Sequence, residues 1–238
     1  KFFSKFFLIL LTIVILAIIF LSYFGIETKR FDNLIKKKAN EVNQYVKLDF
    51  NKTKIHLDIK KFNLIVKLQN PKLLVKDDEI DLSKLDLFLS IKSFYSSDFL
   101  LKKTNIGFEK NDIRDLIKIT NVFLPKIINK RLKKVFVNGS LEGEFIIPFE
   151  VDGNIGKNYG FSAKILNAQI NLTKEFSIKN LTAKINHGKG AKNNGFEALI
   201  KKGSFFDLEL ADTTINLIRE ENETKIKSFL HTKGKLNF

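Results

Sequence analysis

Residues 6–26 form an apolar run without a single charged side chain, and this run constrains the fold more than any other feature. Its 21 residues would extend about 32 Å as a helix, enough to span a bilayer core of about 30 Å. Sixteen of them are Phe, Leu, Ile or Val, which together favour insertion by about 5–10 kcal/mol. The sequence therefore predicts a transmembrane helix that holds the rest of the chain at a membrane surface.

A cleavable signal peptide is the alternative interpretation of this run. Signal peptides have a shorter apolar core, about 7–15 residues long, and end in small residues. Here the run ends in bulky residues such as Tyr23, Phe24 and Ile26, so we expect a retained anchor. The chain contains no Met, and we expect that the start residue has been removed or lies upstream.

The formal net charge of +15 favours anionic partners, and the distribution of the lysines indicates which kind. They are spread along the whole chain instead of forming one basic stripe. We therefore expect no nucleic-acid partner, whereas attraction to anionic lipid headgroups fits a chain beside a membrane anchor. The absence of Cys excludes disulfides, thiolate metal sites and redox chemistry on sulfur.

From Lys47 onward, hydrophobic residues recur with a period of two, as in β-strands that bury one face. Ile55 and Leu57, for example, alternate with charged or polar neighbours. A turn at residues 60–61 and a break at residues 70–71 separate successive strands. The pattern predicts a mainly β protein with an antiparallel sheet, one face apolar and the other wetted.

The same periodicities divide the chain into five parts. These are an anchor over 1–27, an amphipathic juxtamembrane helix over 28–46, a first β block over 47–110, a helical connector over 111–134, and a second β block over 135–238 that we expect to continue beyond the end of the chain. In the connector, Asp112 indicates a helix start, Pro125 a kink or an end, and residues 126–134 a basic linking segment.

The predicted helix over 28–46 carries a basic face beside the anchor. Its candidate membrane-surface residues are Lys29, Arg30, Lys36 and Lys37. An equally favoured interpretation is that this helix covers the open end of the sheet that follows.

No sequence pattern of known catalytic chemistry is present. His56, His187 and His231 are far apart, and there is no zinc-protease, serine-hydrolase or phosphate-loop motif. The acidic pairs at 77–78 and 220–221 fall at predicted turns, where solvation explains them. We predict no catalytic residue, no metal site and no cofactor, and we expect that the protein is not an enzyme.

The order of these parts resembles the N-terminal region of the AsmA-like proteins, the bacterial relatives of chorein-type bridge-like lipid-transfer proteins. The segments that carry the resemblance are the anchor, IHLDIKKFNLIVKLQNPKLLV, EIDLSKLDLFLSIKSFYSSDFLLKKTNIGF, KILNAQINL, FSIKNLTAKI and FFDLELADTTINL. The resemblance implies an elongated, curved sheet with an open apolar groove and one or two accessory helices. It also implies a single-pass inner-membrane protein, mostly periplasmic, that moves phospholipids towards the outer membrane.

Flanking charges argue against that topology, because more cations follow the anchor than precede it. Long domains nevertheless translocate largely regardless of such charges, so we expect the periplasmic location. The partners implied are phospholipids, the bilayer and other envelope proteins.

A sheet that curls without closing would line a trough with its apolar face, which acyl chains could fill. The candidate lipid-binding residues are Ile55, Leu57, Leu64, Val66, Leu68, Leu85, Leu87, Leu89, Ile91, Ile165, Ile170, Leu208 and Leu210. The alternative is that these residues form a sealed core, in which case the chain would be a membrane-anchored scaffold module for envelope assembly, built as a β-sandwich.

Overall fold

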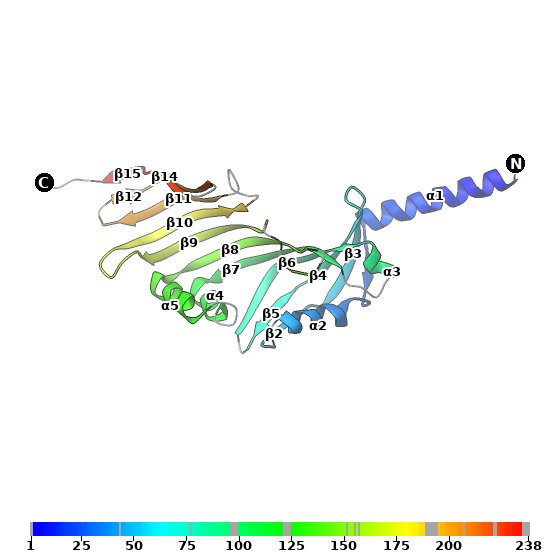
Figure 1. Ribbon diagram of the computed structural model, residues 1–238, viewed down its shortest axis with the longest axis horizontal. Helices are drawn as coiled ribbons and strands as arrows, with labels where there is room; N and C mark the ends of the chain where they lie inside the picture. Colours follow the sequence, from blue (N-terminus) through cyan, green and yellow to red (C-terminus); the bar gives the residue numbers. More distant parts are fainter. Residues whose placement is uncertain are drawn as a thin grey trace.

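The computed structural model describes residues 2–42, 44–76, 78–95, 100–120, 125–150, 152–154, 156, 158–188, 195–206, 208–220 and 223–234. Residues 121–124 of the predicted connector, the last four residues, and Asp77 and Glu221 of the two acidic pairs lie outside these ranges. The described chain is mainly β, with one open antiparallel sheet of fifteen strands and an N-terminal helix at one end (Figure 1). This architecture confirms the predicted fold class.

Helix α1 (Phe2–Tyr23) leaves the sheet along the long axis of the molecule (Figure 1). Its segment Phe3–Tyr23 is long and apolar enough to cross a membrane, and none of it is buried in the protein. The helix ends at Tyr23, and Gly25 follows it with a φ of +69°, which suits glycine. A Cβ atom there would lie 2.6 Å from the carbonyl oxygen of Ile55, so only glycine allows the chain to approach the sheet this closely.

The juxtamembrane helix is shorter than the predicted span 28–46. Strand β1 (Ile26–Thr28) pairs with β3 and draws the first residues of that span into the sheet. Helix α2 therefore runs only over Asp32–Val42. Its apolar side chains Phe31, immediately before the helix, and Ile35 are buried against the sheet, so the helix covers the sheet's open end as the alternative interpretation stated.

The first β block pairs one long antiparallel strand with two shorter ones. Its strands are β2 (Val46–Asp49), β3 (Lys52–Asp58), β4 (Asn63–Gln69), β5 (Lys72–Val75) and β6 (Asp78–Ser90). β4 pairs with the second half of β6 and β5 with its first half, so one long strand faces two short ones. The interruption falls at the predicted break, where Asn70 has a φ of +49° and precedes a proline.

The helical connector differs from the prediction in one respect. After α3 (Lys92–Tyr95), strand β7 (Leu101–Asp112) leads into α4 (Ile113–Thr120), which starts where Asp112 indicated. Residues 126–134, predicted as a linking segment, instead lie in a second helix, α5 (Lys126–Val135). Pro125 precedes this helix and lies at its N-cap, since proline has no N–H to leave unpaired there. Asn129 is buried and donates from its amide to the carbonyl oxygen of Ile117 at 2.8 Å, which holds α5 against α4.

The second β block continues the same sheet, because β7 pairs with the first strand after the connector. Its strands are β8 (Phe136–Pro148), β9 (Gly160–Asn171), β10 (Ser177–His187), β11 (Phe196–Phe205), β12 (Leu208–Leu210), β13 (Thr213–Glu220), β14 (Glu223–Phe229) and β15 (Thr232–Gly234). In Figure 1, α2 lies below the first part of the sheet, and α4 and α5 lie below its middle.

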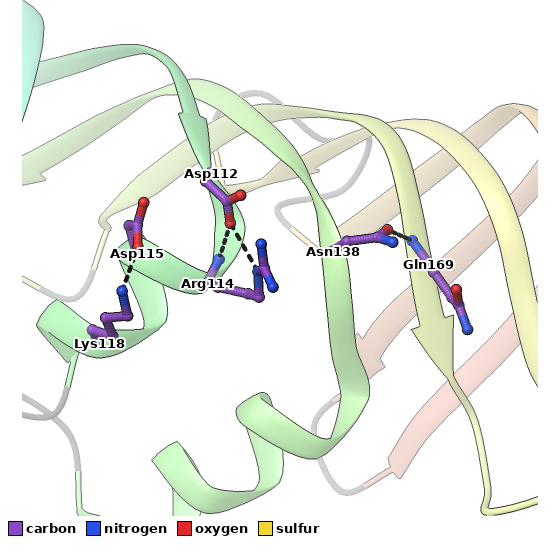
Figure 2. Close-up of polar contacts among 6 residues, drawn as sticks. All are labelled: Asp112, Arg114, Asp115, Lys118, Asn138 and Gln169. Atoms are coloured by element: carbon purple, nitrogen blue, oxygen red, sulfur yellow. Dashed lines mark hydrogen bonds and ion pairs between the residues drawn. The ribbon is translucent and has the colours of Figure 1, made fainter.

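The start of α4 provides a test of this arrangement. Asp112 accepts a hydrogen bond from the backbone N–H of Arg114 at 2.8 Å (Figure 2), so Asp112→Ala is expected to cost about 1 kcal/mol of stability at pH 7. This hydrogen bond lowers the pKa of Asp112, so its stabilisation is complete above about pH 4 and is lost as the pH falls through the folded-state value. Denaturant unfolding of wild type and variant at pH 7 and at about pH 2.5 should show the difference shrink. Asp112→Asn keeps an acceptor and should lose less than the alanine variant; an equal loss would contradict the capping role.

Candidate functional site

One row of side chains runs across nine strands on the same face of the sheet. Each member is the cross-strand partner of the next, and we call the set the cross-strand row: Leu68, Leu85, Ile106, Phe145, Phe161, His187, Phe196, Leu217 and Ile226. Adjacent strands lie about 4.8 Å apart, so eight steps give the row a length of about 38 Å. It forms a nearly continuous apolar track from β4 to β14.

The exposure of this row changes along its length. Leu68 and Leu85 are buried, whereas Phe145 is 40% exposed and Ile226 is 68% exposed. The members between these last two are half-buried. We call Phe145, Phe161, His187, Phe196, Leu217 and Ile226 the open strip. The protein itself leaves the open strip partly exposed, so only a ligand or a partner packed on the sheet could bury these side chains completely.

Aromatic rings dominate the first part of the open strip. The ring centroids of Phe145 and Phe161 are 5.6 Å apart, and those of Phe161 and His187 are also 5.6 Å apart. Phe108 extends the series on one side, and Tyr159 stacks beside His187 at 5.3 Å. The imidazole Nδ1 of His187 lies 3.1 Å from the carbonyl oxygen of Gly195, which fixes the ring in this series.

Small residues lie beside the rings. The neighbouring row of cross-strand partners contains Gly143, Ala163 and Ala198 on β8, β9 and β11. A Cβ atom at Gly143 would lie 2.7 Å from the carbonyl oxygen of Ser162, so this position cannot readily carry a side chain. Rings and small residues therefore lie side by side on this face, with Ile185 between Ala163 and Ala198.

The opposite face of the same strands is polar. Its corresponding row of partners is Gly107, Glu144, Ser162, Asn186, Glu197, Asn216 and Lys227. Ion pairs cross this face, with Lys84 Nζ 2.9 Å from a Glu144 carboxylate oxygen and Lys164 Nζ 2.7 Å from one of Glu142. Burial raises the pKa of Asp86 on the same strands, against the opposing effect of Lys84. Along these two rows, from β7 to β14, one face of the sheet is thus apolar and the other polar.

The predicted groove residues of the first β block do not line an open surface. Seven of them are buried in one core: Ile55, Leu64, Val66, Leu68, Leu85, Leu87 and Leu89. Leu57 and Ile91 are half-buried against it. The residues that cover them belong to the same chain, mainly Phe31 and Ile35 beside or in α2, and Val46 and Val75 in β2 and β5. At these nine positions the side chains lie in or against a core formed by the same chain, as the sealed-core alternative states, and they do not line an open groove.

The predicted residues of the second β block share the apolar face but are divided between two environments. Ile165 and Leu210 are buried in a second core, to which α4 contributes Ile113 and Ile117. Ile170 and Leu208 are half-buried, and both lie in a row that includes Phe136, Ile178 and Phe205. Within the second β block, Ile170 and Leu208 are therefore the predicted positions that keep partial exposure.

The members of the open strip were absent from the predicted set. Their alternation is visible in the sequence, since Phe145 and Ile147 lie two residues apart within β8. What the sequence did not show was the register that aligns Phe145 with Phe161 and Phe161 with His187. The sequence did contain one signal for the open strip, because phenylalanine residues recur in successive predicted strands.

The predicted membrane-surface cations differ in their exposure. Lys29, Arg30 and Lys37 are exposed near the end of α1. Lys36 is held within the fold, with its Nζ atom 3.1 Å from a carboxylate oxygen of Asp49 and 5.0 Å from the ring centre of Phe50. The basic face beside the anchor thus loses one of its four predicted members to an intramolecular ion pair.

A cleft of about 860 Å³ lies where α4, α5, the start of β8 and the turn after β9 meet. Its lining combines apolar and basic side chains: Ile117, Phe136, Val137 and Leu172 with Arg114, Lys118, Lys133, Lys134 and Lys174, together with Asn171 and Thr173. No acidic residue lines this cleft among the described residues. Figure 2 shows that the α4 cations are engaged, Arg114 with Asp112 and Lys118 with Asp115. In the same view Asn138 accepts from the backbone N–H of Gln169 and ties β8 to β9.

Within the part of the chain that the structure describes, no group of three or more His or acidic side chains could hold a metal ion. Comparison of the chain with protein-family models, with curated proteins and with solved structures finds no match. The arguments about function therefore rest on the two-sided sheet, the open strip, the basic cleft and α1.

Proposed function

We propose that the open strip binds the acyl chains of phospholipids, in a protein that α1 anchors in the bacterial inner membrane with its sheet in the periplasm. Under this proposal the chain is an AsmA-like protein that helps to move phospholipids towards the outer membrane. The observation that carries the proposal is the cross-strand row, a track about 38 Å long that is apolar on one side only. Its partly exposed rings make it suited to a flexible apolar ligand.

The physical driving force is burial of apolar surface. Covering the strip would stabilise a complex by about 25 cal/mol for each Å² removed from water. Such contacts are nondirectional, so one surface accepts acyl chains of different length and saturation. Headgroups would remain hydrated at the edge of the strip, and no catalytic group would be needed.

The sealed first core limits where lipids can bind. Because α2 and the β2–β5 ribbon occupy the apolar face from β3 to β6, acyl chains have access only from about β8 onward. Lipids would thus reach the strip from its side, and α1 would serve to hold the sheet near the bilayer.

A second candidate function is a membrane-anchored scaffold module, and the sealed first core is the observation that favours it. In a scaffold the open strip would be covered by a protein partner in place of lipid. The two functions differ in what contacts Phe161 in the membrane.

Photo-crosslinking separates these possibilities without altering the fold. A photoreactive phenylalanine analogue is placed at position 161 of the full chain. The protein is reconstituted in phospholipid nanodiscs and irradiated, and its adducts are identified by mass spectrometry. The matched control places it at Ser162, the next residue of β9, whose side chain lies on the polar face. We expect phospholipid adducts at position 161 to exceed those at position 162 by about fivefold or more. Equal yields at the two positions would overturn the proposal.

A pair of substitutions gives a second measurement. Phe145→Asp with Phe161→Asp puts two charges on the strip and should reduce phospholipid retained after mild-detergent purification by about fivefold or more. Phe62→Asp with Phe229→Asp adds the same charge at exposed positions outside the strip and should leave retention unchanged. If both pairs lower retention equally, the lipid is bound elsewhere.

A further inference from the structure

A second unusual surface lies on the outer side of α5, away from the open strip. Five of the ten residues of α5 are cations: Lys126, Lys130, Arg131, Lys133 and Lys134. All five are exposed, whereas Asn129 and Leu132 face the protein. Ile127 and Ile128 are also exposed, Ile127 by 66%, on a helix that has buried positions available for apolar side chains.

The turns after β9 and β11 extend this surface with further apolar residues. Leu172 and Phe176 are exposed at the first turn, and Phe206 is 68% exposed at the second. The ring centroids of Phe176 and Phe206 are 5.5 Å apart, so the two turns present one aromatic group. Lys174 lies between Leu172 and Phe176, and Glu175 is the only acid in that turn.

The helix and the turns are contiguous. The basic cleft is lined by Lys133 and Lys134 on one side and by Leu172 and Lys174 on the other. The amide of Asn171 donates to the carbonyl oxygen of Lys134 at 3.4 Å, which joins the end of α5 to the turn. We call α5, the β9–β10 turn and the β11–β12 turn together the distal surface.

The cations of the distal surface are available for an external partner. Among the described residues, Lys133, Lys134 and Lys174 form no ion pair. Elsewhere the exposed lysines of this protein are often paired, as Lys118 is with Asp115 on neighbouring α4. Among the described residues of this surface, the five cations of α5 and Lys174 outnumber the single acid Glu175, and the aliphatic and aromatic side chains are exposed at the same place.

We propose that the distal surface docks on an anionic lipid bilayer. Elements that bind the membrane interface typically combine lysine and arginine with exposed Ile, Leu and Phe. The cations contact the headgroups, and the apolar side chains enter the boundary of the acyl region. A nucleic-acid or acidic-protein partner would use the cations but would gain little from Ile127 and Phe206. The lipid surface is therefore the occupant that accounts for both features.

The position of the distal surface makes this bilayer a second one. α1 leaves one end of the molecule, the turns after β9 and β11 lie toward the other end, and α5 lies below the middle of the sheet (Figure 1). With α1 across one membrane, α5 and the two turns lie away from that membrane. The chain would then connect two lipid surfaces, independently of whether acyl chains occupy the open strip.

The test is vesicle capture by the full chain. The protein is held by α1 in nanodiscs of phosphatidylcholine, and vesicles with about 30 mol% phosphatidylglycerol are added and recovered by flotation. We expect the nanodiscs to float with these vesicles and not with vesicles of phosphatidylcholine alone. Equal flotation with both would overturn the proposal.

Two sets of variants identify the surface. Lys130→Glu, Lys133→Glu and Lys134→Glu together should lower capture by about tenfold, whereas Lys67→Glu, Lys184→Glu and Lys227→Glu, with the same change in net charge on exposed positions of the polar face, should lower it less than about twofold. Ile127→Ser with Phe206→Ser should lower it by about threefold, and Phe62→Ser with Phe229→Ser should not.

Each other outcome contradicts the assignment. Equal losses in the two charge sets would show that only net charge matters. Loss with the charge set but not with Ile127→Ser and Phe206→Ser would show that the apolar side chains do not enter the bilayer, and it would overturn the assignment of an interfacial docking surface. Adduct formation at position 161 in the charge variants reports on the open strip separately, so failure of one proposal is distinguishable from failure of the other.

Discussion

Replacing Leu89 by alanine is expected to lower the free energy of unfolding by about 2–5 kcal/mol. Leu89 is fully buried, with Leu64 and Leu101 as its partners on the two neighbouring strands. It lies in the core beneath α2, where close packing leaves little room for collapse around a cavity. Denaturant unfolding of the full chain in mild detergent, followed by circular dichroism, measures the loss.

The control for this substitution is Ile226→Ala in the open strip. Ile226 is on the same apolar face but is 68% exposed, so its truncation should change stability by less than about 0.5 kcal/mol. The two residues differ chiefly in whether the chain itself covers them. If Leu89→Ala left stability unchanged and instead altered phospholipid adducts at position 161, the first β block would be part of a lipid path after all.

The period-two pattern was sufficient to predict the architecture. Alternation such as that of Ile55 and Leu57 reflects a physical requirement, because one face of each strand must leave water. The breaks at glycine, proline and asparagine likewise correspond to real ends of strands, as Asn70 shows with its positive φ. Strand identity and the sidedness of the sheet are therefore local properties that a sequence can reveal.

Which part of the apolar face is covered is not a local property. Val66 and Phe161 have similar patterns of neighbours in sequence, but Val66 is fully buried and Phe161 is half-buried. The difference comes from α2, which packs its residue Ile35 over the first part of the sheet. That helix is amphipathic whether it lies on lipid or on protein, so its hydrophobic pattern alone could not choose between them.

The register between neighbouring strands could not be predicted from the sequence either. Asn167 in β9 and Asn180 in β10 have φ values of +48° and +52°, and the pairing of these strands shifts nearby. Such bulges move a side chain to the other face without a strong sequence signal. The alignment of Phe145, Phe161 and His187 follows from them and could not be counted along the chain.

Gly139→Ala is expected to cost about 3–5 kcal/mol, because it combines backbone strain with overlap in a core. Gly139 has a φ of +121°, a conformation that L-residues rarely adopt. A Cβ atom there would lie 2.5 Å from the Cβ atom and 2.6 Å from the Cα atom of Ala168. Ala168 is fully buried in the second core, so neither strand can move aside without disturbing the contact with α4.

Gly153→Ala separates the two contributions. Gly153 has a φ of +85°, but nothing lies within 4 Å of its added Cβ atom, so it carries the strain without the overlap. We expect that variant to lose about 1 kcal/mol in the same unfolding experiment. Equal losses at the two positions would mean that β8 and β9 separate easily at this bulge. In that case the second core would be loose enough for lipid to enter between α4 and the sheet. The surface accessible to lipid would then extend beyond the open strip into the second core.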